Sequence, residues 1–174
     1  MEDESNQTVA LRQFVDGLMH AEAWAEAITL LENSPQLVRL DFALTWTLGW
    51  AHFKLGRFER AHSVLQDAVT LAPGEYAGYV ALGVILRSLG QLKAAEEALQ
   101  TAIKFRDTDW ARLSLALTYL DTGRLDDAEQ VHVEGLRSKP ESAERWAAYA
   151  DFLSDIGRDL DAADAGRRAA ALES

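Results

Sequence analysis

Hydrophobic side chains recur along this chain at helical spacing, and no segment shows the sustained alternation that is typical of β-strands. The segments 41–55, 76–89 and 110–120 are rich in helix-compatible residues and contain no proline. Proline removes a backbone donor and cannot continue a helix interior, so Pro73 and Pro140 are predicted to separate successive helical segments. The pattern therefore predicts an all-α protein.

Four glycines recur at a nearly constant step of 34, 33 and 34 residues, at Gly56, Gly90, Gly123 and Gly157. Glycine tolerates the positive φ that ends a helix, so each of them predicts a turn between two antiparallel helices. Small residues, which let two helices approach closely, flank every turn. They stand seven positions before it (Gly49, Gly83, Ala116, Ala150) and five positions after it (Ala61, Ala95, Ala128, Ala162).

This recurring combination of small, large and proline positions resembles the tetratricopeptide repeat. The resemblance covers nearly the whole chain and implies a right-handed superhelical solenoid of antiparallel helix-turn-helix hairpins. A fifth, degenerate unit precedes the other four: Ala27 aligns with Ala61, Glu22 replaces the turn glycine, and the proline comes early, at Pro35. We expect a single domain, 1–174, with about five hairpins at 8–41, 42–75, 76–108, 109–142 and 143–174.

The chain departs from the family pattern at several positions. The aromatic residue expected eleven positions before the turn glycine is present as Tyr79 and Trp146, but Thr45 and Arg112 replace it elsewhere. His132 stands where earlier units have leucine. These departures predict looser packing toward the C-terminus within an unchanged fold.

The resemblance implies that the first helix of each hairpin lines a concave groove. Residues thirteen, ten, six and three positions before the turn glycine then point into it. In the three central hairpins these positions are mostly apolar, whereas at the two ends they are mostly charged or polar. The predicted partner-binding groove comprises Trp46, Trp50, Phe53, Val80, Val84, Arg87, Trp110, Leu113, Leu117 and Leu120, and its predicted rim comprises Arg12, Asp16 and Asp151.

An apolar wall of this kind predicts a binding function, because soluble monomers rarely leave a large contiguous apolar patch uncovered. Tryptophan at the centre with charge at the rim is also typical of interface hot spots. We therefore predict a protein-interaction module, an adaptor or small chaperone that binds an apolar or amphipathic segment of another protein.

Three alternatives remain for these apolar side chains. A second copy of the chain could cover them, which would make the protein a structural homo-oligomer. The chain's own terminus could cover them, or neighbouring helices could bury them. A clamp for a C-terminal carboxylate is not predicted, because Arg87 is the only cation in the central wall.

Composition narrows the kind of partner. Hydrophobic residues make up 48% and charged residues 26%, as expected for a folded globular chain. The net charge of −11, from 17 basic and 28 acidic side chains, argues against nucleic acid and against anionic membranes. The first residues lack a signal-peptide pattern, and no apolar run approaches the ~20 residues of a membrane span. We therefore expect a cytoplasmic protein.

No residue pattern predicts catalysis. The chain has no cysteine, which excludes disulfides and thiolate zinc sites. None of the four histidines forms a close metal-ligand pair with another, and no glycine-rich phosphate loop is present. His52 and His132 occupy packed positions of the repeat, so they are predicted to be structural. We expect neither an enzyme nor a metal or cofactor site.

Overall fold

The computed structural model describes residues 2–173, and within them it contains eleven helices and no strand. The helices form two compact units, residues 1–91 and 92–174. The first unit contains α1 (Glu2–His20), α2 (Trp24–Glu32), α3 (Pro35–Val38), α4 (Phe42–Lys54), α5 (Phe58–Leu71) and α6 (Tyr76–Ser88). The second contains α7 (Leu92–Phe105), α8 (Asp109–Asp121), α9 (Leu125–Ser138), α10 (Ala143–Asp155) and α11 (Asp159–Leu172).

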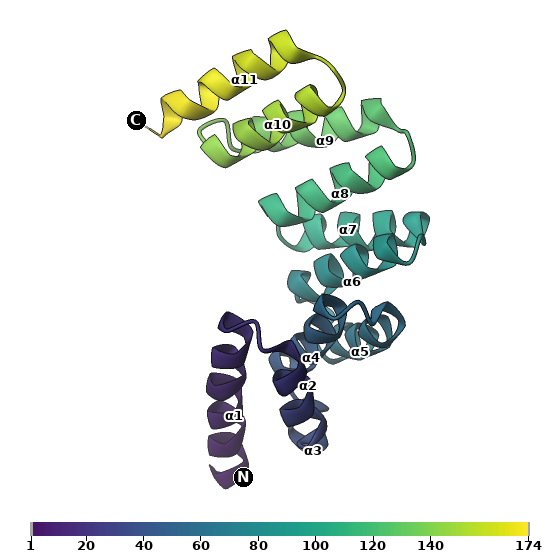
Figure 1. Cartoon of the computed structure of the whole chain (residues 1–174), viewed down its shortest axis with the longest axis vertical. Coiled ribbons are helices and arrows are strands. Elements are labelled where there is room, and N and C mark those ends of the chain that lie inside the picture. The colour runs from purple at the N-terminus through teal and green to yellow at the C-terminus, as the bar shows by residue number, and fades with distance from the viewer. Residues whose placement is uncertain (1, 174) are drawn as a thin grey trace. The chain divides into compact units, whose positions relative to one another are not determined.

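Helices adjacent in sequence pack as neighbours within each unit, as for α4 with α5, α8 with α9 and α10 with α11 (Figure 1). The predicted all-α fold of paired helices is confirmed. The turn glycines adopt the predicted left-handed conformation, with φ between 71° and 76°. Glu22, which replaces the turn glycine of the degenerate first unit, has a φ of 54° and is the only non-glycine with positive φ among the described residues.

In several hairpins, a polar side chain caps the N-terminus of the first helix. Asp41 accepts a hydrogen bond from the backbone nitrogen of Leu44 at 3.0 Å, and so begins α4. Thr108 caps α8 and Ser142 caps α10 in the same way. Each cap satisfies one of the backbone N–H groups that a helix start leaves without a partner.

Close helix packing follows from the small residues of the repeat. A Cβ added at Gly49 on α4 would lie 2.6 Å from Cγ of Leu65 on α5, and Leu65 is fully buried. Ala61, Ala68 and Ala81 lie in the same cluster as Leu65. Glycine at position 49 therefore allows α4 and α5 to approach within the second hairpin.

Two of the junctions between hairpins share one kind of contact. The hydroxyl of Tyr79 donates to the backbone oxygen of Pro73 at 3.1 Å, and the indole nitrogen of Trp146 donates to that of Pro140 at 2.9 Å. Arg112 and Asp107 occupy the corresponding positions before α8, and there Nε of Arg112 donates to Oδ1 of Asp107 at 2.6 Å. An ion pair thus replaces the aromatic–proline contact.

The first hairpin differs from the others in its second helix. The second helices α5, α7, α9 and α11 each contain 14 residues, whereas α2 contains only 9 and ends at Glu32. The early Pro35 begins the short helix α3 instead of continuing α2. The chain therefore changes direction where a regular second helix would continue.

Candidate partner-binding surfaces

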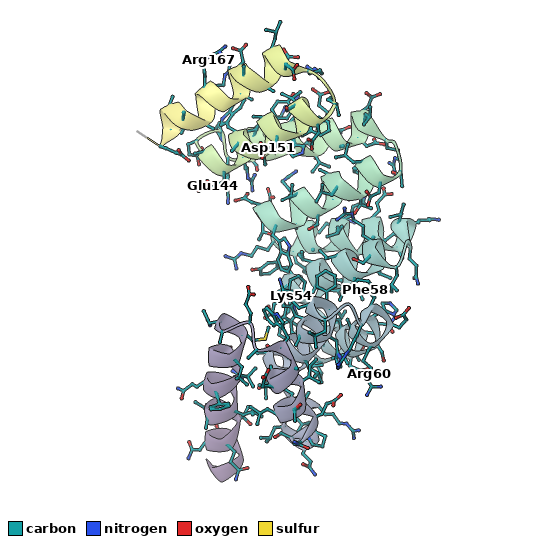
Figure 2. All side chains as sticks on the ribbon, in the orientation of Figure 1. Lys54, Phe58, Arg60, Glu144, Asp151 and Arg167 are labelled. Atoms are coloured by element: carbon teal, nitrogen blue, oxygen red, sulfur yellow. The ribbon has the colours of Figure 1, made fainter. Side chains whose placement is uncertain are left out.

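In the first unit, the predicted wall residues of α4 form an aromatic row. The rings of Trp46 and Trp50 stack with centroids 5.7 Å apart and planes inclined by 10°. Trp50 and Phe53 follow at 4.8 Å, and Phe53 lies 5.8 Å from Phe58 at the start of α5, which Figure 2 labels. Trp46, Trp50 and Phe53 are partly buried and pack against the core cluster around Leu65. The row therefore combines core packing with an accessible face.

The α6 part of the predicted wall is less exposed than the sequence indicates. The indole nitrogen of Trp46 donates to the backbone oxygen of Ala77 at 3.1 Å, which ties α4 to α6. Val84 and Arg87 are partly buried. Val80 is fully buried, so its predicted place on the wall is wrong. Its side chain belongs to the packed interior, where helix packing has covered a position that the repeat register leaves open.

In the second unit, α8 carries the corresponding residues. Trp110 is 37% exposed and Leu113 is 42% exposed, while Leu117 and Leu120 are partly buried. The neighbouring helix α10 presents Glu144 and Asp151, both exposed (Figure 2). Exposed apolar and acidic side chains therefore occur on adjacent helices of this unit.

The predicted rim residues differ in their surroundings. Arg12 forms an ion pair with Asp41, the capping residue of α4, so it stabilises the junction between the first two hairpins. Asp16 is exposed, and its backbone oxygen lies 2.7 Å from Nδ1 of His20. Arg12 thus has a structural partner, whereas the carboxylate of Asp151 faces solvent.

A buried arginine that the residue pattern does not predict connects three helices of the second unit. Arg145 on α10 is 5% exposed and donates to Oδ1 of Asp109 at 2.5 Å and to the backbone oxygen of Gly135 at 2.6 Å. It also contacts Asp107, which Arg112 binds from α8. Burial alone would raise the pKa of Asp107, but the hydrogen bond and charge of Arg112 hold that pKa below its ordinary value.

His132 on α9 is buried, as its repeat position predicts. Its ring stacks 5.0 Å from Phe152 and 5.9 Å from Tyr149, measured between centroids. Burial, helped by the charge of Arg112, lowers the pKa of His132 to about 4. The ring is therefore uncharged at neutral pH and acts as an aromatic core residue.

A cavity in the first unit was not predicted. It has a volume of about 750 Å³ and lies among α2, α3, α4 and α5, with His52, Leu48 and Val64 in its lining. Two features of the sequence point to it in retrospect: the early Pro35 and a histidine at a position that usually carries a packed aromatic residue. Neither feature alone indicates how large a space the shortened helix leaves.

Neither a cluster of metal-ligating side chains nor a membrane-spanning helix occurs among the described residues. Nowhere among them do three or more histidine, aspartate or glutamate side chains gather in a way that could hold a metal ion. None of their helices is both long and apolar enough to cross a membrane.

The fold and the recurring turns define a helical-repeat protein, and comparison with known families specifies which one. Two tetratricopeptide repeat models match, over residues 47–109 and 86–152. The chain belongs to the tetratricopeptide repeat family.

Solved structures agree on the fold. A crystal structure of MamA protein aligns with a TM-score of 0.73 at 20% identity and covers 99% of this chain and 93% of that one. MamA 41-end from Desulfovibrio magneticus RS-1 aligns with a TM-score of 0.73 at 19% identity and covers 95% of this chain and 94% of that one. At this level of identity the likeness concerns the fold alone. No curated protein matches the sequence significantly.

Proposed function

We propose that this chain is an adaptor or small chaperone that binds an apolar or amphipathic segment of a partner protein. The segment would bind to the accessible faces of the helices that come first in each hairpin, such as α4 and α8. The family supports a role in protein interaction at the coarser level. The observation that carries the finer proposal is the exposure of Trp110 and Leu113 on α8. The free energy falls when a partner covers large apolar side chains that have this much surface in contact with water.

The first unit contributes its own surface to the proposal, the row of Trp46, Trp50 and Phe53. Tryptophan is enriched among residues that dominate binding energy. Burial of an apolar side chain contributes about 1.5–3 kcal/mol before the costs of association. Two or three such side chains in either unit contribute about 3–9 kcal/mol before those costs, toward the roughly 8 kcal/mol that micromolar binding requires.

The direct test compares capture of partner proteins from the native cell extract by wild-type protein and by single variants. Trp50→Ala and Leu113→Ala should each reduce capture of the same identified partner while helical content, measured by circular dichroism, stays unchanged. Leu40→Ala and Leu160→Ala are matched controls, because these leucines are 84% and 86% exposed and lie outside the predicted wall. Capture that is unchanged in both wall variants would show that these surfaces do not bind the partner.

A structural homo-oligomer built by the same apolar residues is the alternative. Light scattering over decreasing protein concentration separates the two functions. A monomer at low concentration whose walls bind a foreign segment supports the adaptor. A dimer that persists on dilution in the wild type and dissociates in Trp50→Ala or Leu113→Ala supports self-assembly. A cytoplasmic location, a non-catalytic role and independence of metals and cofactors also stay predictions.

A further inference from the structure

The cavity of the first unit shares no lining residue with the proposed partner-binding surfaces, and apolar side chains form part of its lining. Val38 on α3, Leu48 on α4 and Val64 on α5 line it, and it has a volume of about 750 Å³. Both sides of the break between α2 and α3 contribute, with Leu31 before the break and Pro35 after it. A volume of this size falls within the range that pockets for small molecules occupy, about 300–1,000 Å³.

The repeat supplies an internal comparison, because the second unit has the corresponding cleft among α7, α8 and α9. That cleft has a volume of about 340 Å³ and is lined by Leu115 and Val131 at the repeat positions of Leu48 and Val64. Arg112 reaches across it and donates to the backbone oxygen of Val131 at 3.1 Å. A full-length second helix and a long side chain thus reduce the space in the second unit, whereas α2 is short in the first.

The residue four positions before the turn glycine also differs between the two clefts. In the second unit it is Tyr119, whose hydroxyl donates to Glu96 at 3.0 Å and accepts from Gln100 at 3.1 Å. In the first unit it is His52, which is 2% exposed and lines the cavity, and neither of its ring nitrogens has a hydrogen-bond partner. A buried polar group without a partner has lost its hydrogen bonds to water and gained none in return, which destabilises the fold. A ligand that supplies the missing partner would offset this destabilisation.

Charged side chains of both signs surround His52, and a carboxylate already lies between this ring and Arg60. Arg39 and Arg60 line the cavity together with Glu32 and Asp67, and the charge of Arg57 also acts on the His52 ring. Arg60 lines the cavity and projects from α5 (Figure 2), and its guanidinium is 3.9 Å from Glu32. Oε1 of Glu32 thus lies 3.8 Å from Nε2 of His52 and 3.9 Å from Arg60, so one carboxylate in this place meets both groups.

Glu32 is the group that a ligand must displace. Its Oε1 lies 3.8 Å from Nε2 of His52, beyond hydrogen-bond distance, and its side chain is 49% exposed. A half-exposed glutamate can swing outward at little cost, and this movement uncovers the edge of the imidazole. The N–H of His52 and the guanidinium of Arg60 then become available as donors to one carboxylate.

We propose that this cavity binds an amphipathic monocarboxylate, with its apolar chain against Val38, Leu48 and Val64 and its carboxylate on His52 and Arg60. Two sources share this chemistry: a free medium-chain acid, and the C-terminal carboxylate of an apolar peptide. The site is independent of the proposed partner-binding walls, so either proposal can fail alone.

Isothermal titration calorimetry with the full chain tests the site. Decanoate, decan-1-ol and decylammonium have the same apolar tail and differ only in the charge of the head group. An apolar pentapeptide with a free C-terminal carboxylate is compared with the same peptide carrying a C-terminal amide. Saturable one-to-one binding of decanoate or of the free-acid peptide, with weaker binding of the uncharged and cationic partners, is the expected result. Tighter binding of decanoate identifies a free medium-chain acid as the ligand, and tighter binding of the peptide identifies a C-terminal carboxylate.

The variants locate the binding. His52→Leu introduces the residue that the chain itself has at the same repeat position, Leu86, so the fold should tolerate it. His52→Leu and Arg60→Gln should each weaken carboxylate binding about 10-fold, as expected for the loss of one hydrogen bond to a charged group. Arg137→Gln, an exposed arginine on α9 in the other unit, should leave it unchanged. Equal binding of decanol, undiminished binding by both cavity variants, or no saturable binding of either carboxylate would overturn the proposal.

Discussion

Nε of Arg112 donates a hydrogen bond to Oδ1 of Asp107 at 2.6 Å, and this pair occupies the place of the aromatic–proline contact that joins other hairpins. The two departures from the repeat pattern therefore compensate each other. The second nitrogen of the guanidinium reaches the other carboxylate oxygen at 3.1 Å, so the contact is bidentate. The ion pair before α8 thus connects two hairpins in the way that the Tyr79–Pro73 contact does before α6.

A double-mutant cycle measures this compensation. The side chains of Arg112 and Asp107 are 14% and 31% exposed, so solvent screens their interaction only in part. We expect the Asp107→Ala and Arg112→Ala variants to show a coupling energy of about 1–2 kcal/mol in urea unfolding. The exposed pair Arg167–Asp164 is the control, and its cycle should give about 0–0.5 kcal/mol. Equal coupling in the two cycles would contradict a structural role for the junction.

Glu22 offers a stabilising substitution. Its φ of 54° lies in the left-handed region, which costs a residue with a side chain about 1–2 kcal/mol more than glycine. Glu22→Gly should therefore raise the free energy of unfolding by about 0.5–1 kcal/mol, after the greater freedom of glycine in the unfolded chain is subtracted. Glu26→Gly, within α2, should lower it by about 1 kcal/mol. A destabilised Glu22→Gly variant would show that the turn depends on the glutamate side chain.

His132 predicts a specific pH dependence. Because burial lowers its pKa to about 4 from an ordinary 6.5, the unfolded chain binds a proton in this interval that the folded chain does not. Folding stability should be unaffected by this group above pH 6.5. It should fall as the pH drops toward 4, by about 3 kcal/mol in total.

His132→Leu, which restores the leucine of earlier repeats, should remove this loss and flatten the stability curve between pH 6.5 and 4. Chemical unfolding at half-unit steps of pH measures it. The other titrating groups are common to both proteins and cancel in the comparison. Identical slopes in the wild type and the variant would mean that His132 accepts a proton in the folded protein.

Trp46 is expected to contribute to stability as well as to the wall. Trp46→Phe keeps a ring against Trp50 but removes the donor to the backbone oxygen of Ala77, and it should lower the free energy of unfolding by about 1 kcal/mol. Trp46→Ala also removes the packing and should cost about 3 kcal/mol. A neutral Trp46→Phe variant would indicate that the hydrogen bond contributes nothing to the contact between α4 and α6.

The recurring residues predicted the helices and turns because each has a local cause. The four turn glycines adopt positive φ, and Gly49 meets Leu65 at a distance that excludes a larger residue. The repeat also identified Glu22 as the replacement of a turn glycine, and its φ agrees. Local geometry of this kind is encoded over a few residues, so a repeat register suffices to find it.

Features that depend on several helices together were harder to predict. Val80 fits the wall by register, yet it is fully buried. Arg145 is buried because acceptors at Asp109 and Gly135 converge on it from elsewhere in the second unit. The cavity beside His52 combines a shortened helix with a change of side chain two elements away. Each depends on which side chains the packed helices bring together, and spacing along the chain does not determine this.

Site-specific photocrosslinking tests the binding surfaces most directly. A photoreactive phenylalanine analogue is placed at position 50 or 113, and at positions 40 and 160 as exposed controls, and each protein is irradiated in the native cell extract. We predict crosslinks to a different protein from positions 50 and 113 and none to it from positions 40 and 160. Crosslinks to that protein of equal yield from all four positions, or from the controls alone, would contradict recognition by these walls, and crosslinks only to a second copy would favour self-assembly.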